Sequence, residues 1–380
     1  MKAHRTFGLR ARRGYPGNGR SCRFHVGFDK TKQAFKFDCV PEHDSLQPRC
    51  STHSVGKMVL SPLPTIRLFA FLLAIYSITS MLSFHAFSET ALSDSYPGDL
   101  GIGKDKSVVF ADDFESDNLK KWDDFDGNPE PFNHLMPASG PLGLNANHVV
   151  RLRAPSGKRG GADLVKVLPE GYDRLYARWY VKYEPGFNFN APNHGGGLHA
   201  GSRNLLGRSD NRPEGNDWFC AWIEHTTDTH RNCAYVYYRG MYQDCADPHG
   251  RCWGDHFPAK SDGPFAGKPQ HQPRISPPVL ESGKWYCVEI MMDGGNPGTT
   301  ENGANGVLDY WIDGVEIGPW NDLWLRTTGN LKIDIFWLNL FHHDGTHSDE
   351  GILIDNVVVA TKRIGIGRPL NHPAGHNTGN

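Results

Sequence analysis

Short runs of alternating apolar and polar residues, separated by clusters of glycine, proline, asparagine and aspartate, constrain the fold of this chain most strongly. In the run Arg174–Tyr183, one face of an extended strand carries leucine, alanine, tryptophan and valine. The opposite face carries Arg178, Tyr180 and Lys182. This period of two is that of a β-strand with two different surroundings.

Comparable runs recur along the second half of the chain, and Asp313-Gly314 is a strong hairpin signal. The other predicted strands are Ser107–Ala111, His148–Arg153, Trp218–His225, Ala234–Arg239, Lys284–Met292, Val307–Ile317, Leu331–Phe341 and Gly351–Lys362. No segment shows a long helical apolar stripe, and 43 glycines and 26 prolines supply the turns. Many strands without interleaved helices predict an all-β protein, a β-sandwich or jelly roll with one concave open sheet.

The N-terminal part has a different composition. Residues 1–57 place basic side chains among glycine, proline and serine, which predicts a disordered basic extension. The apolar run Leu68–Phe84 is shorter than the ~20 residues of a spanning helix and is followed by small residues up to Ser88. We therefore expect a signal peptide over 58–88 with Met58 as the true start, or alternatively an uncleaved anchor. Either leader implies a protein that is secreted or held in the cell envelope.

Behind this leader we expect one jelly-roll domain over 89–363 and a disordered tail over 364–380. Export permits disulfides, and Cys245 and Cys252 flank a turn-rich segment that a local disulfide could close. The formal net charge is −2, so a nucleic acid is not an expected partner. No feature indicates a protein partner, and we expect a monomer.

Two segments carry candidate functional side chains. Asn193–Asn204 contains three consecutive glycines, which let a backbone approach a ligand closely, with His194, His199 and Arg203 around them. The alternative is a flexible loop with incidental histidines. In Ala234–Arg239, two tyrosines and Arg239 share one face, a combination suited to stacking on sugars and binding carboxylates.

The tyrosine face has a structural alternative, an aromatic ladder that stabilises the sheet. Trp222 and Glu224 on the preceding predicted strand could extend the same face.

The segment Leu175–Phe187, followed by the glycine-rich segment, resembles polysaccharide lyases of the alginate-lyase type in the concanavalin A-like jelly-roll superfamily. Tyr235 and Tyr237 are similar to the paired tyrosines of that family, and Asp309–Gly314 and Ile354–Val359 are similar to its closing strands. The resemblance extends over most of the body of the chain. It implies a concanavalin A-like β-sandwich that acts on an acidic polysaccharide.

Two positions depart from the family pattern, and one of them is an arginine that the family has on the strand before the tyrosine pair and that Trp218–His225 lacks. Where the family has a lysine after a glycine pair, this chain has Gly197. The resemblance implies cleavage of a uronate polymer by β-elimination, which needs a group that neutralises the carboxylate, a base and an acid, and no cofactor. The candidates are Arg178, Lys182, Arg203 and Arg239 for neutralisation, His194 and His199 as base, Tyr235 and Tyr237 as base or acid, and Tyr180, Trp222 and Glu224 as further substrate contacts.

Two other functions remain open at this point. A glycoside hydrolase of the same fold would need paired carboxylates, whereas Glu224 stands alone on its strand. A lectin-like module would use the same aromatic face without catalysis. A structural calcium ion at Asp112 and Asp355, on the first and last strands, is a weaker expectation from analogy.

Overall fold

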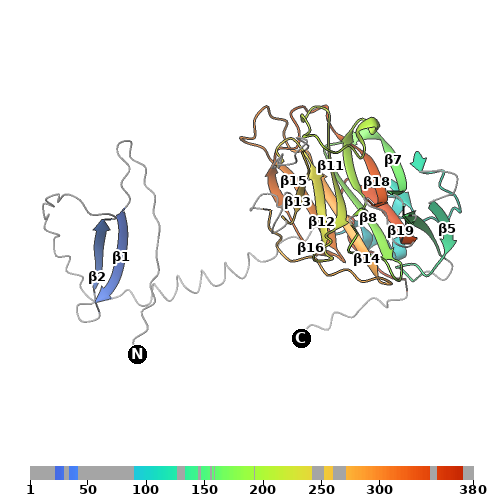
Figure 1. Ribbon diagram of the computed structural model, residues 1–380, viewed down its shortest axis with the longest axis horizontal. Helices are drawn as coiled ribbons and strands as arrows, with labels where there is room; N and C mark the ends of the chain where they lie inside the picture. Colours follow the sequence, from blue (N-terminus) through green and yellow to red (C-terminus); the bar gives the residue numbers. More distant parts are fainter. Residues whose placement is uncertain are drawn as a thin grey trace. The chain divides into compact units, whose positions relative to one another are not determined.

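The structure is a computed structural model of the 380-residue chain (Figure 1). It describes residues 90–125, 133–143, 147–154, 156–157, 159–191, 193–241, 252–259, 271–342 and 349–370, and the backbone of two strands nearer the N-terminus. The chain divides into two units, Met1–Phe84 and His85–Asn380. Within the described residues, no helix is both long enough and apolar enough to span a membrane.

In the first unit, strand β1 (Cys22–Asp29) pairs antiparallel with β2 (Ala34–Pro41). These strands fall inside the segment for which composition predicted disorder. The apolar run expected to form the signal peptide or anchor lies outside the described residues.

The second unit contains two antiparallel sheets (Figure 1). The eight-stranded sheet has the order β13-β12-β11-β10-β18-β7-β4, and β9 pairs with β18. Its strands are β4 (Asp124–Phe125), β7 (Gly160–Tyr172), β9 (Asn193–His194), β10 (Gly197–Gly201), β11 (Trp218–His225), β12 (Asn232–Tyr237), β13 (Asp255–Phe257) and β18 (Ile333–His342). Strand β11 begins and ends at the residues predicted for it, Trp218 and His225.

The nine-stranded sheet has the order β16-β15-β14-β8-β19-β6-β5, with β17 beside β15 and β3 beside β19. Its strands are β3 (Val108–Asp112), β5 (Asn133–Pro137), β6 (His148–Ala154), β8 (Arg174–Tyr183), β14 (Trp285–Asp293), β15 (Gly306–Ile312), β16 (Val315–Glu316), β17 (Trp320–Leu323) and β19 (Glu350–Ala360). The predicted hairpin is confirmed, because Asp313 and Gly314 connect β15 to β16 with positive φ values of 51° and 78°.

The hydrophobic core lies between the two sheets. Trp179 of β8 meets Phe336 of β18 with ring centroids 6.0 Å apart, so the inner faces are in direct contact. Leu175 and Ala177 share this core and have no exposed surface. The alternation of β8 thus places its apolar residues between the sheets, and the expected all-β sandwich is confirmed.

The outer face of the nine-stranded sheet is covered by the two ends of the described domain. The 3-10 helices η1 (Leu92–Ser95), η2 (Pro97–Asp99) and η3 (Ile102–Lys104) run beside residues 363–370. The Ser93 amide donates to the Ile364 carbonyl, and Ile364 is fully buried with Ile102 in a second apolar cluster. Of the tail expected to be disordered, residues 364–370 are described: Ile364 is packed in this cluster, whereas Ile366 and Leu370 are exposed.

Candidate active site

A cavity of about 660 Å³ lies on the outer face of the eight-stranded sheet. Its walls combine aromatic rings with polar and charged groups. The rings are Trp222, Tyr235, Tyr237, Trp253, Trp337 and Phe341, and the polar groups include Arg159, Asp163, Asn193, His194, Glu224, His256 and Asn339. A cavity in which aromatic rings and convergent polar groups meet is typical of a ligand or active site.

Strand register explains why these side chains meet. Across β11 and β12, Trp222 lies opposite Tyr235, and Tyr235 in turn lies opposite His256 of β13. Further along the same sheet, beyond β10, Phe341 of β18 lies opposite His194 of β9. Residues directly opposite in an antiparallel pair point to the same face. A single sheet face therefore receives side chains from strands that are far apart in the sequence.

Two glycines allow β9 and β10 to lie against β11. A Cβ at Gly195 would lie 1.9 Å from the Ile223 carbonyl oxygen, and one at Gly197 would lie 2.0 Å from that of Ala221. Only glycine permits these approaches. The glycine run expected to approach a ligand instead approaches β11, and it thereby holds His194 over the cavity.

His194, Glu224 and His256 form a hydrogen-bonded chain along one wall of the cavity. His194 Nδ1 is 2.6 Å from Glu224 Oε2, and His256 Nε2 is 3.3 Å from Glu224 Oε1. Burial alone would raise the pKa of Glu224, but the charges and hydrogen bonds of the two histidines lower that pKa below its usual range. Glu224 is therefore an ionised acceptor at neutral pH.

The ionised carboxylate fixes the tautomer of His194. Nδ1 lies 3.2 Å from the indole Nε1 of Trp222 as well, but two N–H groups cannot hydrogen-bond to each other. Because the contact with Glu224 is shorter and its acceptor is charged, Nδ1 carries the proton. The lone pair of neutral His194 then lies on Nε2, in a side chain that keeps 20% of its surface exposed.

A pair of tyrosines lies next to this histidine. The Tyr235 ring stacks on His194 with centroids 5.7 Å apart and an interplanar angle of 6°. The Tyr235 and Tyr237 hydroxyls are 2.9 Å apart, and the Gly254 amide donates to Tyr235 over 3.2 Å. Burial raises the pKa of both phenols, so both hydroxyls keep their protons at neutral pH.

Arg159 is the one arginine or lysine among the described side chains that line the cavity. It is exposed, and its guanidinium lies 5.7 Å from the centre of the Phe341 ring. We did not predict it from the sequence, because it stands outside every predicted strand. Its only signal there is a cation immediately before the glycine pair at 160 and 161.

Three predicted substrate contacts lie on the other sheet. Arg178 has no exposed surface, and its guanidinium pairs with Asp99 of η2 at 2.5 Å. The Tyr180 hydroxyl accepts a hydrogen bond from the Gly367 amide. Lys182 lies over the Trp285 ring, 5.0 Å from its centre. These residues stabilise the covered face of the nine-stranded sheet, and the structure does not bring them to the cavity.

The other candidates on or near the eight-stranded sheet also stand apart from the cavity walls. His199 is only 1% exposed, and burial lowers its pKa to about 4. Arg203 forms an ion pair with Asp124, and Arg239 lies 5.0 Å from the centre of the Trp324 ring. Of the predicted site residues, the structure assembles His194, Trp222, Glu224, Tyr235 and Tyr237 at one cavity.

The predicted calcium ligands already have protein donors. Asp112 accepts hydrogen bonds from Lys121 and Trp122, and Asp355 accepts from Asn147 and Asn356. A structural calcium there stays a prediction. The predicted disulfide involves Cys245, which lies outside the described residues.

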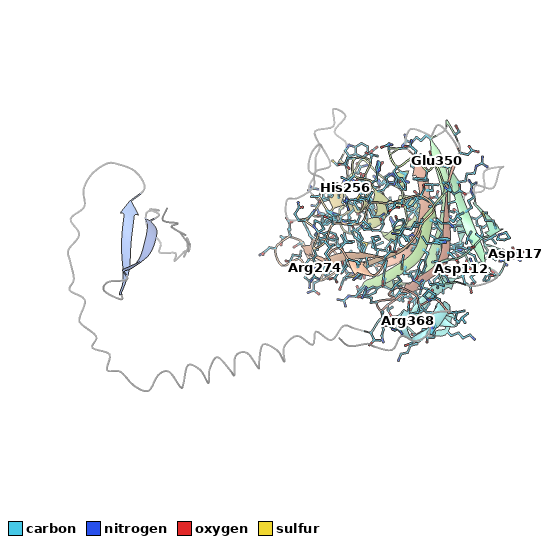
Figure 2. All side chains as sticks on the ribbon, turned by 90° about the horizontal axis from the view of Figure 1, so that it is seen from below. Asp112, Asp117, His256, Arg274, Glu350 and Arg368 are labelled. Atoms are coloured by element: carbon cyan, nitrogen blue, oxygen red, sulfur yellow. The ribbon has the colours of Figure 1, made fainter. Side chains whose placement is uncertain are left out.

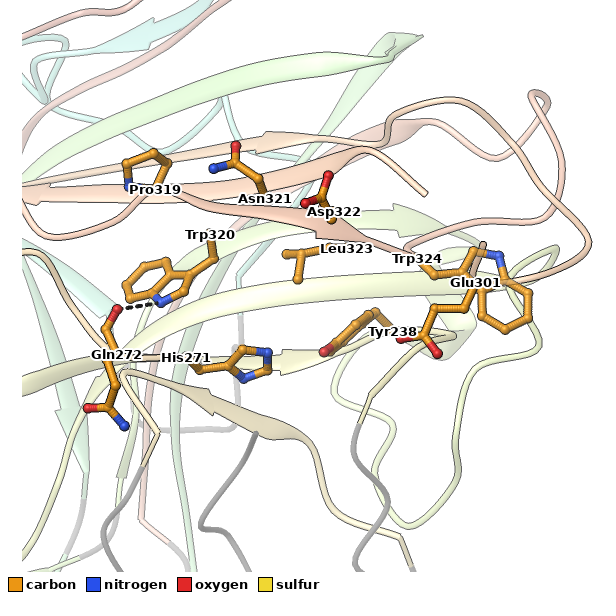
Figure 3. A pocket seen from close by; sticks show the side chains of 10 residues that line it. All are labelled: Tyr238, His271, Gln272, Glu301, Pro319, Trp320, Asn321, Asp322, Leu323 and Trp324. Atoms are coloured by element: carbon orange, nitrogen blue, oxygen red, sulfur yellow. Dashed lines mark hydrogen bonds between the residues drawn. The ribbon is translucent and has the colours of Figure 1, made fainter. Parts of the chain in front are cut away.

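A second cavity of about 420 Å³ is lined by Tyr238, Trp320 and Trp324 and by the carboxylates Glu301 and Asp322 (Figure 3). The Trp320 indole donates to the Gln272 carbonyl in its wall. This cavity contains none of the His194–Glu224–His256 chain. Figure 2 labels His256 of the first cavity and Arg368 of the covering segment, which lie at different places on the domain.

The strands and the first cavity define a class of protein: a two-sheet β-sandwich with a histidine–glutamate chain and a tyrosine pair on one open face. No family model matches the chain, and no curated protein matches it. Solved structures do resemble it. The alginate lyase vAL-1 from Chlorella virus is 14% identical and aligns with 67% of this chain and 100% of its own, with a TM-score of 0.48.

Two further likenesses are of the same kind. The marine PL-14 alginate lyase from Aplysia kurodai is 13% identical over 67% of this chain and 97% of its own, with a TM-score of 0.46. The endo-beta-1,4-glucuronan lyase from the fungus Trichoderma reesei is 12% identical over 68% and 98%, with a TM-score of 0.44. Because these TM-scores are below 0.5, the fold and the function of this chain are inferred from its own strands and side chains.

Proposed function

We propose that this protein is a polysaccharide lyase that cleaves a uronate-containing polymer by β-elimination in the 660 Å³ cavity. The observation that carries the proposal is the shared position of a base, an acid and a cation. His194 is held by an ionised carboxylate, the neutral Tyr235–Tyr237 pair lies beside it, and Arg159 lines the same cavity.

The cation acts first in this mechanism. The proton next to a carboxylate is too weakly acidic to remove unless the charge that develops on the carboxylate is stabilised. Arg159 can form two parallel hydrogen bonds to the uronate carboxylate from one guanidinium. Its place over Phe341, which lies opposite His194, puts that charge beside the base.

His194 is assigned as the base. Its Nε2 lone pair takes the proton from the carbon that bears the carboxylate. Glu224 accepts the Nδ1 proton of the ring at 2.6 Å and stabilises the imidazolium that forms, which is the role of the carboxylate in a catalytic triad. His256 holds the second oxygen of Glu224 and so fixes the orientation of the carboxylate.

Tyr235 is assigned as the acid. As the double bond forms, the bond to the glycosidic oxygen breaks, and this oxygen takes the phenol proton. Tyr237 can then donate its own hydrogen bond to the developing phenolate across 2.9 Å. Tyr235 keeps 6% of its surface exposed and Tyr237 none, which favours Tyr235 as the group that meets the substrate.

The two carboxylates among the described lining residues do not suit hydrolysis. A glycosidase needs one protonated carboxyl as its acid. Glu224 is ionised between two histidines, and Asp163 accepts hydrogen bonds from Trp337 and Asn339. Stacking rings such as Trp222 and Trp337 suit sugars in general. The proposed substrate is an acidic polysaccharide, and the proposed location is outside the cytoplasm, as the leader sequence predicts.

The test is an elimination assay on the full chain. Alginate, polyglucuronate, pectate and glycosaminoglycans are offered in turn, and the ultraviolet absorbance of the unsaturated uronyl product is followed. We expect a rise with one polymer that is lost in His194→Ala. New reducing ends without this absorbance would show hydrolysis instead. Binding of a polymer without any product would show a lectin.

A further inference from the structure

One wall of the cavity brings together three side chains that can ligate a metal ion. Glu224 of β11, Cys233 of β12 and His256 of β13 offer one ligand atom each, and these atoms all lie within 4.8 Å of one another. All three side chains are buried. Glu224 and Cys233 are direct cross-strand partners, so their proximity is set by sheet register.

From this geometry we propose a binding site for a borderline or soft divalent cation, zinc in the first place, at Glu224, Cys233 and His256. Bonds of about 2.0–2.3 Å to nitrogen, oxygen and sulfur in a tetrahedron place ligand atoms roughly 3.3–3.8 Å apart. The Glu224 and His256 atoms already have this spacing at 3.3 Å. The Cys233 sulfur completes three corners after a small side-chain adjustment.

The ligand set selects the metal. A thiolate and an imidazole favour zinc, cobalt and copper, whereas magnesium and calcium require oxygen ligands throughout. The fourth corner can be taken by water. An ion can reach the site because Glu224 and His256 line the open cavity.

The site has a consequence for catalysis that rests on the proposed function. A cation bound to Glu224 would withdraw the carboxylate charge that orients His194 and would disfavour the imidazolium. Zinc is therefore expected to inhibit elimination, and a chelator to restore it. Binding and inhibition are separate measurements, so a chain without lyase activity would still test the metal site.

The binding test uses the full chain freed of metal by chelation. Titration calorimetry with zinc chloride should show one ion bound per chain, and cobalt should give the near-ultraviolet charge-transfer band of a thiolate ligand. Cys233→Ala should abolish that band and weaken zinc binding on the order of 100-fold. The matched control is Cys220→Ala, which removes another buried thiol four pairs along the same strand pair and should keep both signals.

Three outcomes would overturn the site. They are no zinc binding to the wild-type chain, cobalt binding without a thiolate band, and zinc affinity unchanged in Cys233→Ala. If Cys233→Ala fails to fold, Glu224→Gln serves in its place, since it removes a ligand charge with little change of shape. Zinc affinity retained in Glu224→Gln would place the ion elsewhere and equally contradict the proposal.

Discussion

The outer faces of the two sheets carry the same kinds of residue, but one face is covered by other segments of the chain and the other lines a cavity. Strand β8 presents Arg178 and Tyr180 outward, and β12 presents Tyr235 and Tyr237 outward. On the nine-stranded sheet, the two ends of the domain lie over this surface and bury Arg178 against Asp99. On the eight-stranded sheet, the tyrosines line a cavity together with His194.

The difference lies in what covers each face. A buried arginine in an ion pair holds a segment in place, since separating the charges would leave one of them unpaired inside the protein. A buried tyrosine pair beside an accessible histidine can instead exchange protons with a ligand. Alternation assigns a side chain to a face, but the function of that face depends on contacts that are distant in the sequence.

The largest expected effect contrasts one residue from each face. His194→Ala removes the proposed base, so kcat/KM should fall by about 10²–10⁴-fold. The variant should also unfold at a lower temperature, because the buried Glu224 loses its shortest hydrogen bond, so the rates are compared at a temperature where both proteins are folded. Initial rates on the best polymer and a melting curve check both parts.

Lys182→Ala is the matched variant on the covered face. Its ammonium lies over the Trp285 ring on the nine-stranded sheet, and we expect kcat/KM to change little. An equal loss of activity in Lys182→Ala and His194→Ala would mean that the two faces do not differ in function.

The second effect concerns stability. Arg178→Ala leaves Asp99 as a buried unpaired carboxylate and should cost about 3–5 kcal/mol of unfolding free energy. The double variant Arg178→Met with Asp99→Asn should recover part of this loss, because it leaves no unpaired charge. Urea unfolding measures both. A single variant as stable as the wild type would show that the ion pair does not hold the covering segment.

The sequence predicts the architecture well because the alternation of apolar and polar residues within each strand shows which of its faces is buried. The predicted run Arg174–Tyr183 coincides with β8, and Trp218–His225 coincides with β11. Each of these runs is bounded by turn-forming residues, which are local signals. The sequence analysis does not predict β7. It interprets β9 and β10 as a glycine loop, because glycine favours a flexible backbone and the sequence does not show that these glycines pack against β11.

The site is predictable only in part. His194, Tyr235 and Tyr237 stand out locally as functional groups, whereas the partners of Glu224 depend on the register of three strands. Arg159 reaches the cavity because β7 pairs with β18 and β18 with β9, which no local pattern indicates. Arg178 was selected as a ligand contact because the sequence does not show which segment covers β8.

The third effect tests the arginine that sequence analysis missed. Arg159→Ala should lower kcat/KM by about 100-fold, mostly through the carboxylate it neutralises. Arg159→Lys should retain part of the activity, since it keeps the charge and loses the paired hydrogen bonds. Arg203→Ala, which removes a cation tied to exposed Asp124, should change kcat/KM by less than about threefold. If Arg203→Ala is the more damaging variant, the neutralising role passes to Arg203.

The last effect, small within any one pH unit, is a pH dependence at β19, the last strand of the nine-stranded sheet. Burial, with the nearby charges of Glu115 and Asp113, raises the pKa of Asp355 to about 7, although Asn147 and Asn356 donate to it. The folded protein therefore keeps a proton that the unfolded chain has lost. Its contribution to stability is complete below the unfolded pKa of about 3.8 and is lost as the pH rises to about 7.

Urea unfolding should accordingly show stability falling by at most about 1.4 kcal/mol per pH unit over this interval from Asp355. Asp355→Asn should flatten the dependence, because the amide does not titrate. Adding calcium distinguishes the two roles considered for Asp355, a calcium ligand and a buried acid that keeps its proton. An ion bound to ionised Asp355 would stabilise the protein more at pH 8 than at pH 5, as the calcium expectation requires. A steep fall in stability that calcium leaves unchanged would instead identify Asp355 as a buried acid that is stabilised by its proton.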